Sequence, residues 1–233
     1  MIVIIPSYND RKFLERLLES LFTEPAGIDF KVLIVSDFST DDTEQWLAGL
    51  NNKGITVIKP KEKSYFTRTC NAGLQWAMMH TKDEFMFLLN SDTIATDGWG
   101  SSLIATSKKF DAGIIGATLL NMDGTIQHLG AYGEGYHFNI NKPWLRYRND
   151  RLVPWVTGAA MCVRRDVVQK VGFLPVKEKK QYDASDRDYC TIARMSYGIE
   201  VAVSTGSVFY HDTHEARSIR LNRGDYTVGE LYG

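Results

Sequence analysis

The stretch IVIIPSYNDRKFLERLLESLFTEPAGIDFKVLIV, residues 2–35, carries the strongest fold signal in the chain. Ile2–Ile5 and Val32–Val35 are short and rich in β-branched residues, as expected of strands that are buried on both faces. Between them, apolar residues starting at Phe13 recur at helical spacing. This order predicts a strand–helix–strand unit of a parallel sheet.

The same alternation continues through the N-terminal half. A helix through Trp46 leads to a strand over Ile55–Ile58, and a helix over about 67–79 leads to a strand over Phe85–Leu89. Repeated units of this length predict the α/β class, with a Rossmann-like, mostly parallel sheet and helices on both faces. Ligands of such sheets bind beyond the carboxyl ends of the strands, so the residues that follow each strand are the first candidates for a site.

The second half loses this regular alternation. A strand-like run over 113–120 is followed by the turn signal Asn121–Gly124, which predicts a hairpin, and residues 132–155 read as a long loop. The remaining predicted elements are a strand over 155–163, a short helix, a helix over about 185–197 and a strand over 199–203.

Composition and charge limit the possible functions. A chain of 233 residues suits one large domain or two small ones, and its net charge of −1 argues against a general positive field for nucleic acid. The apolar runs are too short to span a bilayer, and the N-terminus lacks the basic region of a signal peptide. Three widely spaced cysteines fit buried thiols in a reducing compartment. We therefore expect a cytoplasmic protein, with peripheral contact to a membrane as the alternative.

Common nucleotide-binding and hydrolase motifs are missing from the sequence. It holds no G-x-x-x-x-G-K-[ST] segment, and no G-x-G-x-x-G follows the first strand. A G-x-S-x-G elbow is missing too, which argues against a serine hydrolase.

Polar residues follow three of the predicted strands and can meet at one rim of the sheet. They are Pro6-Ser7-Tyr8-Asn9, Ser36-Asp37-Phe38-Ser39 and Asn90-Ser91-Asp92. A carboxylate at Asp92 can bind Mg²⁺ or Mn²⁺, which prefer oxygen ligands, or it can cap a following helix.

A second acidic group precedes or opens the helix predicted over 185–197. It comprises Asp183, Asp186 and Asp188. The helix dipole favours acidic residues there without any catalytic purpose, so a structural and a catalytic role both stay open. His211 and His214 follow a further strand-like run, and by themselves they are a weak metal signal.

Seven segments, taken in order, resemble the family 2 glycosyltransferases. They are Val3-Ile-Ile-Pro-Ser-Tyr-Asn9, Val35-Ser-Asp-Phe-Ser-Thr-Asp41, Arg68 with Asn71-Ala-Gly73, Leu88-Leu-Asn-Ser-Asp92, Thr157-Gly-Ala-Ala160, Ser185-Asp-Arg-Asp188 and Tyr210-His211. The resemblance runs from residue 1 to about residue 215. The nearest subgroup is the rhamnosyltransferase-like enzymes, which carry a similar LLNPDT segment.

The resemblance implies the GT-A fold in a single domain over residues 1–233. Residues 1–120 would form the nucleotide-sugar-binding half and residues 121–233 the acceptor and catalytic half. The implied reaction is metal-dependent, inverting transfer of a sugar from a UDP- or dTDP-sugar to an acceptor hydroxyl. A glycan or a lipid-linked glycan is the expected acceptor, and a modified nucleic-acid base is less favoured.

The resemblance also assigns roles to individual residues. The donor site would comprise Pro6, Ser7, Tyr8, Asp37, Arg68, Asn90 and Ser91. Asp92 would hold Mn²⁺ or Mg²⁺, with His211 as a second metal ligand or a diphosphate contact. Asp186 would be the general base that takes the acceptor proton, and Asp188 stands close enough to compete for that role.

The sequence departs from the family pattern at three positions, which keeps other functions open. Ser36, Asn90 and Ser185 each stand where the family usually has an acidic residue. A non-catalytic module that binds a sugar or nucleotide is therefore one alternative. A nucleotidyltransferase is another, although its usual Gly-rich basic loop after the first strand is replaced by Pro6–Asn9.

The long loop is rich in aromatic and basic residues. Candidates for an acceptor groove, or for ordinary loop anchoring, are Tyr132, Tyr136, His137, Trp144 and Trp155. Arg146, Arg148 and Arg151 can hold an anionic acceptor or simply be solvated.

Overall fold

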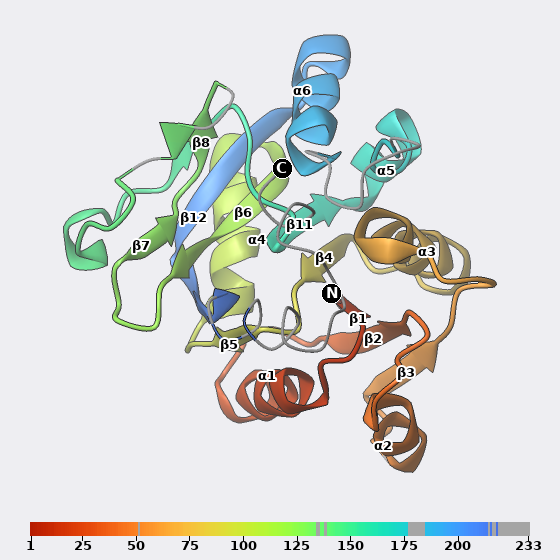
Figure 1. Cartoon of the computed structure of the whole chain (residues 1–233). Helices are drawn as coiled ribbons and strands as arrows, with labels where there is room; N and C mark the ends of the chain where they lie inside the picture. The colour runs from red at the N-terminus through yellow and green to blue at the C-terminus, as the bar shows by residue number, and fades with distance from the viewer. Residues whose placement is uncertain are drawn as a thin grey trace.

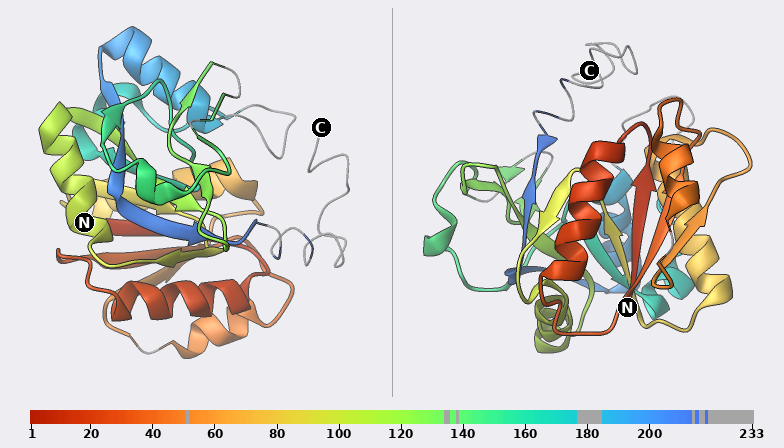
Figure 2. Two further views of the ribbon diagram at one scale, coloured as in Figure 1. Left: turned by 90° about the vertical axis from the view of Figure 1, so that its left-hand side faces the viewer. Right: turned by 90° about the horizontal axis from the view of Figure 1, so that it is seen from below.

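A ten-stranded sheet runs through the molecule, with helices on both faces (Figures 1 and 2). This computed structural model describes residues 1–50, 52–133, 136–137, 139–176, 185–213, 215 and 218. The sheet confirms the predicted α/β class. Asp183 and His214 lie outside the described residues.

The first half follows the predicted order of elements. They are β1 (Ile2–Ser7), α1 (Arg11–Thr23), β2 (Lys31–Ser36), α2 (Thr43–Gly49), β3 (Ile55–Ile58), α3 (Tyr65–His80) and β4 (Phe85–Leu89). β4 has the predicted bounds, and α3 begins at Tyr65, slightly earlier than expected.

Two further elements, β5 (Thr93–Ala95) and α4 (Trp99–Phe110), had no counterpart in the sequence prediction. The sequence of α4, WGSSLIATSKKF, contains Gly, Ser and Thr, which have lower helix propensity than Ala or Leu. Packing against the sheet stabilises this helix instead, since Trp99 and Leu103 are fully buried.

The second half contains shorter and less regular elements. They are β6 (Ala112–Leu120), β7 (Ile126–His128), β8 (Ala131–Tyr132), β9 (Tyr136–His137), the 3₁₀ turn η1 (Trp144–Arg146), β10 (Arg151–Leu152), β11 (Ala160–Arg164), α5 (Arg165–Val171), α6 (Ser185–Tyr197) and β12 (Glu200–His211). β6 and β7 pair antiparallel, which confirms the hairpin. α6 has the predicted bounds.

The strand predicted over 155–163 is wrong for its first five residues, because β11 begins at Ala160. The backbone amides of Thr157 and Gly158 do not bond to a neighbouring strand. They donate to His128 Nε2 at 3.1 Å and to Asp186 Oδ2 at 2.7 Å. Side-chain acceptors thus satisfy the backbone N–H groups that would otherwise pair with a neighbouring strand.

The strand order is β10-β12-β6-β11-β4-β1-β2-β3, with β5 beside β12 and β7 beside β6. The expectation of a mostly parallel sheet holds from β3 to β4, where neighbouring strands are parallel. It fails beyond β4, because β11 enters between β4 and β6 and is antiparallel to both. The complete sheet is therefore mixed, and it continues across the predicted boundary at residue 120.

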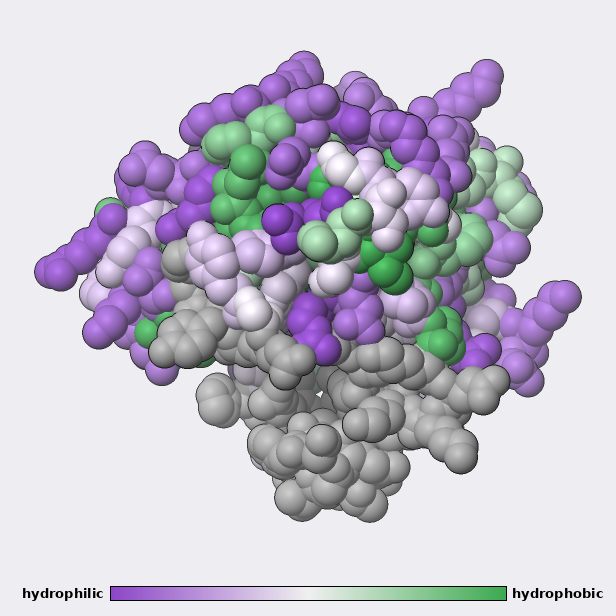
Figure 3. All heavy atoms as spheres, turned by 90° about the horizontal axis from the view of Figure 1, so that it is seen from above, coloured by the Kyte–Doolittle hydropathy of each residue, from purple (hydrophilic) through white to green (hydrophobic). Residues whose placement is uncertain are grey.

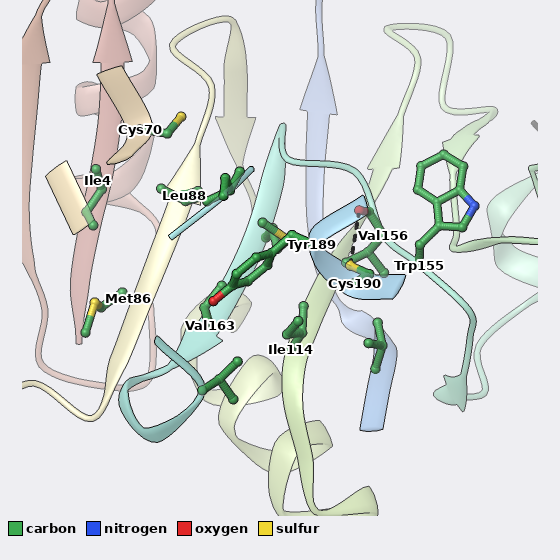
Figure 4. Packing of buried hydrophobic residues seen from close by; sticks show 14 of the residues in the cluster. Ile4, Cys70, Met86, Leu88, Ile114, Trp155, Val156, Val163, Tyr189 and Cys190 are labelled. Atoms are coloured by element: carbon green, nitrogen blue, oxygen red, sulfur yellow. Dashed lines mark hydrogen bonds between the residues drawn. The ribbon is translucent and has the colours of Figure 1, made fainter. Parts of the chain in front are cut away.

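Hydrophobic cores lie on both faces of the sheet. One packs α1 and α4 against the sheet, and the other packs α3, α5 and α6. Figure 4 shows part of the second core, in which Cys190 Sγ lies 4.0 Å from the carbonyl oxygen of Val156. Cys70, Cys162 and Cys190 are free and buried, as predicted, and burial raises the pKa of Cys190 to about 12.

The surface on the α6 side of the molecule is hydrophilic over much of its area and has hydrophobic patches within it (Figure 3). The large apolar side chains that α6 exposes include Ile192 and Met195. Within the part of the chain that the structure describes, no helix is both long and apolar enough to cross a bilayer.

Gly73 allows α3 to lie close to β1 and β2. A Cβ atom at this position would overlap Ile4 Cγ2 and would lie 3.1 Å from Val35 Cγ2. The Asn71-Ala-Gly73 segment therefore has a packing role. Gly73 permits the close contact with the sheet, and the Asn71 side chain exchanges two hydrogen bonds with the backbone of Leu174.

We expect Gly73→Ala to lower the free energy of unfolding by about 1–3 kcal/mol, because overpacking outweighs the better helix propensity of alanine. Denaturant unfolding monitored by circular dichroism measures the change. Gly49→Ala is the control, since Gly49 is also a helical glycine, the last residue of α2, but has open space around it. Equal stability of the two variants would contradict the packing role of Gly73.

Candidate active site

The residues after β1 and β2 are joined at the carboxyl edge of the sheet. Asp37 donates its backbone N–H to Ser7 O at 2.8 Å, and Asn9 donates its own to Ser39 Oγ at 3.0 Å. β1 lies between β2 and β4, so Asn90, which follows β4, belongs to the same edge. The convergence expected from the sequence is therefore present.

The carboxylate of Asp37 organises the start of α3. It is buried, and its two oxygens accept the N–H groups of Ser64 at 2.7 Å and Tyr65 at 2.8 Å. Burial raises the pKa of Asp37 above its ordinary value, and the two backbone hydrogen bonds act in the opposite direction. Lys63 lies beside this turn and places its ammonium 3.7 Å from the centre of the Tyr8 ring.

Asp92 and His211 form a buried pair at the end of β12. Asp92 Oδ1 lies 3.1 Å from His211 Nε2, and the backbone oxygen of Asp92 accepts the N–H of Asp212 at 2.9 Å. The pairing of β5 with β12 sets this distance, because it places Thr93 opposite His211. Two residues 119 positions apart are thereby held within hydrogen-bond reach.

Gln127 of β7 orients the His211 ring. Its Nε2 donates to His211 O at 3.1 Å and to Asn121 Oδ1 at 3.2 Å, which fixes the amide so that Oε1 faces the ring. Oε1 lies 2.5 Å from His211 Nδ1, and it can only accept, so Nδ1 carries a proton. Nε2 is then the ring nitrogen that faces Asp92: it can donate to Asp92 Oδ1 when it carries a proton, or offer its lone pair to a cation when it does not.

These residues fit a divalent cation. Asp92 offers carboxylate oxygens, His211 offers a nitrogen lone pair, and the buried Oδ1 of Asn90 has no hydrogen-bond partner. Mg²⁺ and Mn²⁺ favour such oxygen-rich ligand sets and often share their coordination with substrate phosphates. Among the described residues there is no group of three or more His, Cys, Asp or Glu side chains arranged for a metal. Any cation here would thus take further ligands from elsewhere.

Asp186 opens α6 and is held by backbone donors. Its Oδ2 accepts the N–H of Gly158 at 2.7 Å, and its Oδ1 accepts the N–H of Arg187 at 2.8 Å. Asp188 lies two residues further along α6, with its carboxylate 3.6 Å from Arg187 Nε. The two aspartates therefore have different partners.

Short contacts link the two acidic centres. Asn90 donates its N–H to Ala159 O at 2.9 Å, and Ala159 directly follows the glycine that binds Asp186. On the other side, Thr67 Oγ1 and Ser185 Oγ lie 2.9 Å apart, so α3 contacts the start of α6. Arg68 is the exposed neighbour of Thr67 and projects from the same turn.

The family described as Glycosyl transferase family 2 matches residues 2–172, which is more than half of the sequence. The chain belongs to glycosyl transferase family 2. This membership confirms the predicted family and the enzyme class, a glycosyltransferase domain.

Curated relatives of this family 2 chain are distant. The Uncharacterized protein y4gI of Sinorhizobium fredii (strain NBRC 101917 / NGR234) is 24% identical over 226 residues, which cover 91% of the chain and 24% of that protein. The O-antigen biosynthesis protein RfbC of Myxococcus xanthus is 23% identical over 242 residues, covering 96% of the chain and 18% of that protein. The chain spans about a quarter or less of the length of these two relatives.

Solved structures similar to this family 2 chain confirm the predicted GT-A fold. S. aureus TarS 1-349 in complex with UDP-GlcNAc superposes with a TM-score of 0.63 at 19% identity, covering 91% of the chain and 58% of that structure. GalNAc-T7 with UDP, GalNAc and Mn²⁺ superposes with a TM-score of 0.67 at 15% identity, covering 91% and 43%.

Three residues beside the site were missed from the sequence. Gln127 and His128 lie in the short strand β7, and Lys63 lies in the turn before α3. The sequence signal for Gln127 is weak: it is a polar residue next to Ile126 in a short strand. Its importance follows only from the strand pairing.

We expect Asp37→Ala to lower the free energy of unfolding by about 1–3 kcal/mol, because the amides of Ser64 and Tyr65 lose their acceptor. Chemical denaturation measures the effect. Asp42→Ala is the control, since Asp42 forms an exposed ion pair with Arg11 and such pairs contribute little. A stable Asp37→Ala variant with weakened donor binding would instead point to a purely ligand-binding role.

Proposed function

We propose that this chain transfers a sugar from a nucleotide-diphosphate donor to an acceptor hydroxyl, with inversion and with the help of a divalent cation. The observation that carries the proposal is the pair of acidic centres, Asp92 with His211 and Asp186 with Gly158, joined through Ala159 on one sheet edge. An inverting displacement needs a centre that offsets the charge of the departing diphosphate and a base for the hydroxyl proton.

The donor site proposed here lies at the ends of β1, β2 and β4 and the first turn of α3. It comprises Pro6, Ser7, Tyr8, Asp37, Arg68, Asn90 and Ser91. TarS with UDP-GlcNAc and GalNAc-T7 with UDP support a nucleotide sugar, with UDP favoured and dTDP as the other candidate. In this proposal residues 1–120 bind the donor, residues 121–233 bind the acceptor, and both belong to a single domain.

The cation is proposed to bind between Asp92 and His211. Mn²⁺ in the GalNAc-T7 structure supports this type of ion, and Mg²⁺ is the alternative. When bound, it would supply positive charge against the diphosphate. The role of Gln127 is to keep the His211 proton on Nδ1, so that Nε2 remains available as a ligand.

Asp186 is proposed as the general base. The acceptor oxygen bonds to the anomeric carbon while the bond to the diphosphate breaks, and the hydroxyl proton moves to the Asp186 carboxylate. The N–H groups of Gly158 and Arg187 hold that carboxylate while leaving each oxygen a further lone pair. Asp188 is less suited, because its carboxylate lies beside the Arg187 guanidinium.

A cell-surface glycan or its lipid-linked precursor is the proposed acceptor. The name of RfbC, an O-antigen biosynthesis protein, supports that class. The rhamnosyltransferase-like subgroup and the cytoplasmic location stay predictions. A catalytic role is favoured over a non-catalytic binding module because two backbone N–H groups hold the Asp186 carboxylate in a fixed orientation.

We expect the protein with Mn²⁺ to release nucleoside diphosphate from its donor sugar, and Asp186→Asn to lower turnover by about 10²–10⁴-fold. Asparagine keeps the acceptor oxygen for Gly158 but cannot take a proton. A thermal-shift screen of UDP- and dTDP-sugars first identifies the donor, and the shift should persist in Asp186→Asn.

Asp188→Asn is the matched control for this test and should retain most of the turnover. Near-normal turnover in Asp186→Asn would refute the assigned base. No turnover and no thermal shift with any donor in the unmodified protein would refute the transferase function.

We expect Asp92→Ala to abolish Mn²⁺ binding and Gln127→Leu to weaken it by about 10–100-fold, since the hydrogen bond with Gln127 sets the orientation of the His211 ring. Isothermal titration with Mn²⁺ and UDP measures both. Gln75→Leu, an exposed change on α3, is the control and should bind normally. Unchanged Mn²⁺ affinity in Gln127→Leu would show that Gln127 does not orient His211.

A further inference from the structure

Residues 139–152 form a segment that projects from the side of the molecule, around the η1 turn. This turn is the green coil at the far left of Figure 1, and it lies at the same extreme in the right-hand view of Figure 2. The segment exposes three large apolar side chains: Leu145 is 70% exposed, Ile140 is 47% exposed and Leu152, at its end, is 43% exposed. We call residues 139–152 the η1 segment.

The η1 segment is anchored, so these apolar residues are held outward. Trp144 and Tyr147 pack against the core on their inner side. Its backbone is tied to β7, because Asn141 N–H donates to Ile126 O at 2.8 Å and Ile126 N–H donates to Lys142 O at 2.9 Å. Leu145 lies between two anchored aromatic residues and faces solvent.

The exposed charge of the η1 segment is positive. Lys142, Arg146 and Arg148 are exposed, and Arg148 places its guanidinium 4.7 Å from the centre of the Trp144 ring. The acidic residue of the segment, Asp150, points inward, where its carboxylate accepts hydrogen bonds from Thr205 and Thr106. The chain as a whole has a net charge of −1, so this positive charge is a local feature.

A neighbouring acidic side chain lies on the adjoining hairpin. The carboxylate of Asp123 is exposed and accepts hydrogen bonds from the backbone and hydroxyl of Thr125. It is therefore occupied within its own turn. Within residues 121–128 and 139–152, all of which the structure describes, Asp123 is the exposed carboxylate, so the three basic side chains are in excess.

We propose that the η1 segment docks on an anionic lipid bilayer. Leu145 and Ile140 enter the boundary between headgroups and acyl chains, while Lys142, Arg146 and Arg148 contact anionic headgroups. Basic residues around a projecting apolar tip match the two contributions to peripheral membrane binding, electrostatic attraction and apolar burial. Nucleic acid would use the charge but would leave the tip without a role.

The docked geometry places the proposed active site near the bilayer. Ile126 is bonded to the η1 segment, and the next residue, Gln127, contacts His211. A lipid-linked acceptor would then reach the site along the membrane surface. This consequence rests on the proposed function. Binding to lipid does not, so lipid binding is measured without donor or acceptor.

Vesicle flotation with the unmodified protein tests the proposal. We expect it to float with phosphatidylglycerol-containing vesicles, to float much less with pure phosphatidylcholine, and to dissociate as salt is raised. Arg146→Gln with Arg148→Gln should weaken partitioning by roughly 25-fold, at about fivefold for each basic residue near an anionic surface. Leu145→Ser should weaken it at every salt concentration.

Two matched variants control for general loss of charge or apolar surface. Lys108→Gln with Lys109→Gln removes two exposed basic residues of α4, and Met195→Ser removes an apolar residue that is 78% exposed on α6. Both should float like the unmodified protein. Absence of flotation, equal flotation with neutral vesicles, or equal losses in the control variants would each overturn the proposal. Lipid binding without glycosyl transfer would refute only the proposed function.

Discussion

Helix α3 approaches the sheet to a distance that only a glycine at position 73 permits. Much of the site depends on this approach. The start of the helix takes both oxygens of Asp37, its first turn carries Arg68, and Thr67 contacts Ser185 at the beginning of α6. A packing constraint on one helix thus sets the relative positions of the donor edge and the proposed base.

Interactions between distant segments complete the arrangement. β5 pairs with β12 and brings Asp92 to His211, while the loop before β11 gives up strand pairing so that Gly158 can bind Asp186. Both features depend on irregular backbone at the ends of regular strands. The chemistry is therefore concentrated where the sheet stops, as is usual for α/β folds.

The sequence was most informative where local pattern and final structure agree. β4 and α6 have the predicted bounds, because one is a continuous apolar run and the other has clear helical spacing. Ordered motifs identified the family and selected Asp92, His211 and Asp186 as candidates, and the structure brings the first two together.

Other features depend on contacts that no local pattern records. Helix α4 forms from residues of modest helix propensity because Trp99 and Leu103 are buried. The residues at 155–159 look like a strand, yet the amides of Thr157 and Gly158 bind the side chains of His128 and Asp186. Gln127 acquires its role only through the ring of a residue 84 positions away.

The sheet continues from β4 through β11 and β6 to β12, so strand hydrogen bonds connect the two proposed halves. Rigid-body closure about a hinge would have to break this ladder. Changes in acceptor preference during evolution are therefore expected to arise by exchange of the loops at the edge, such as 153–159, while the framework of strands is kept. A new acceptor specificity in such a molecule comes from replacing the loops around the sheet.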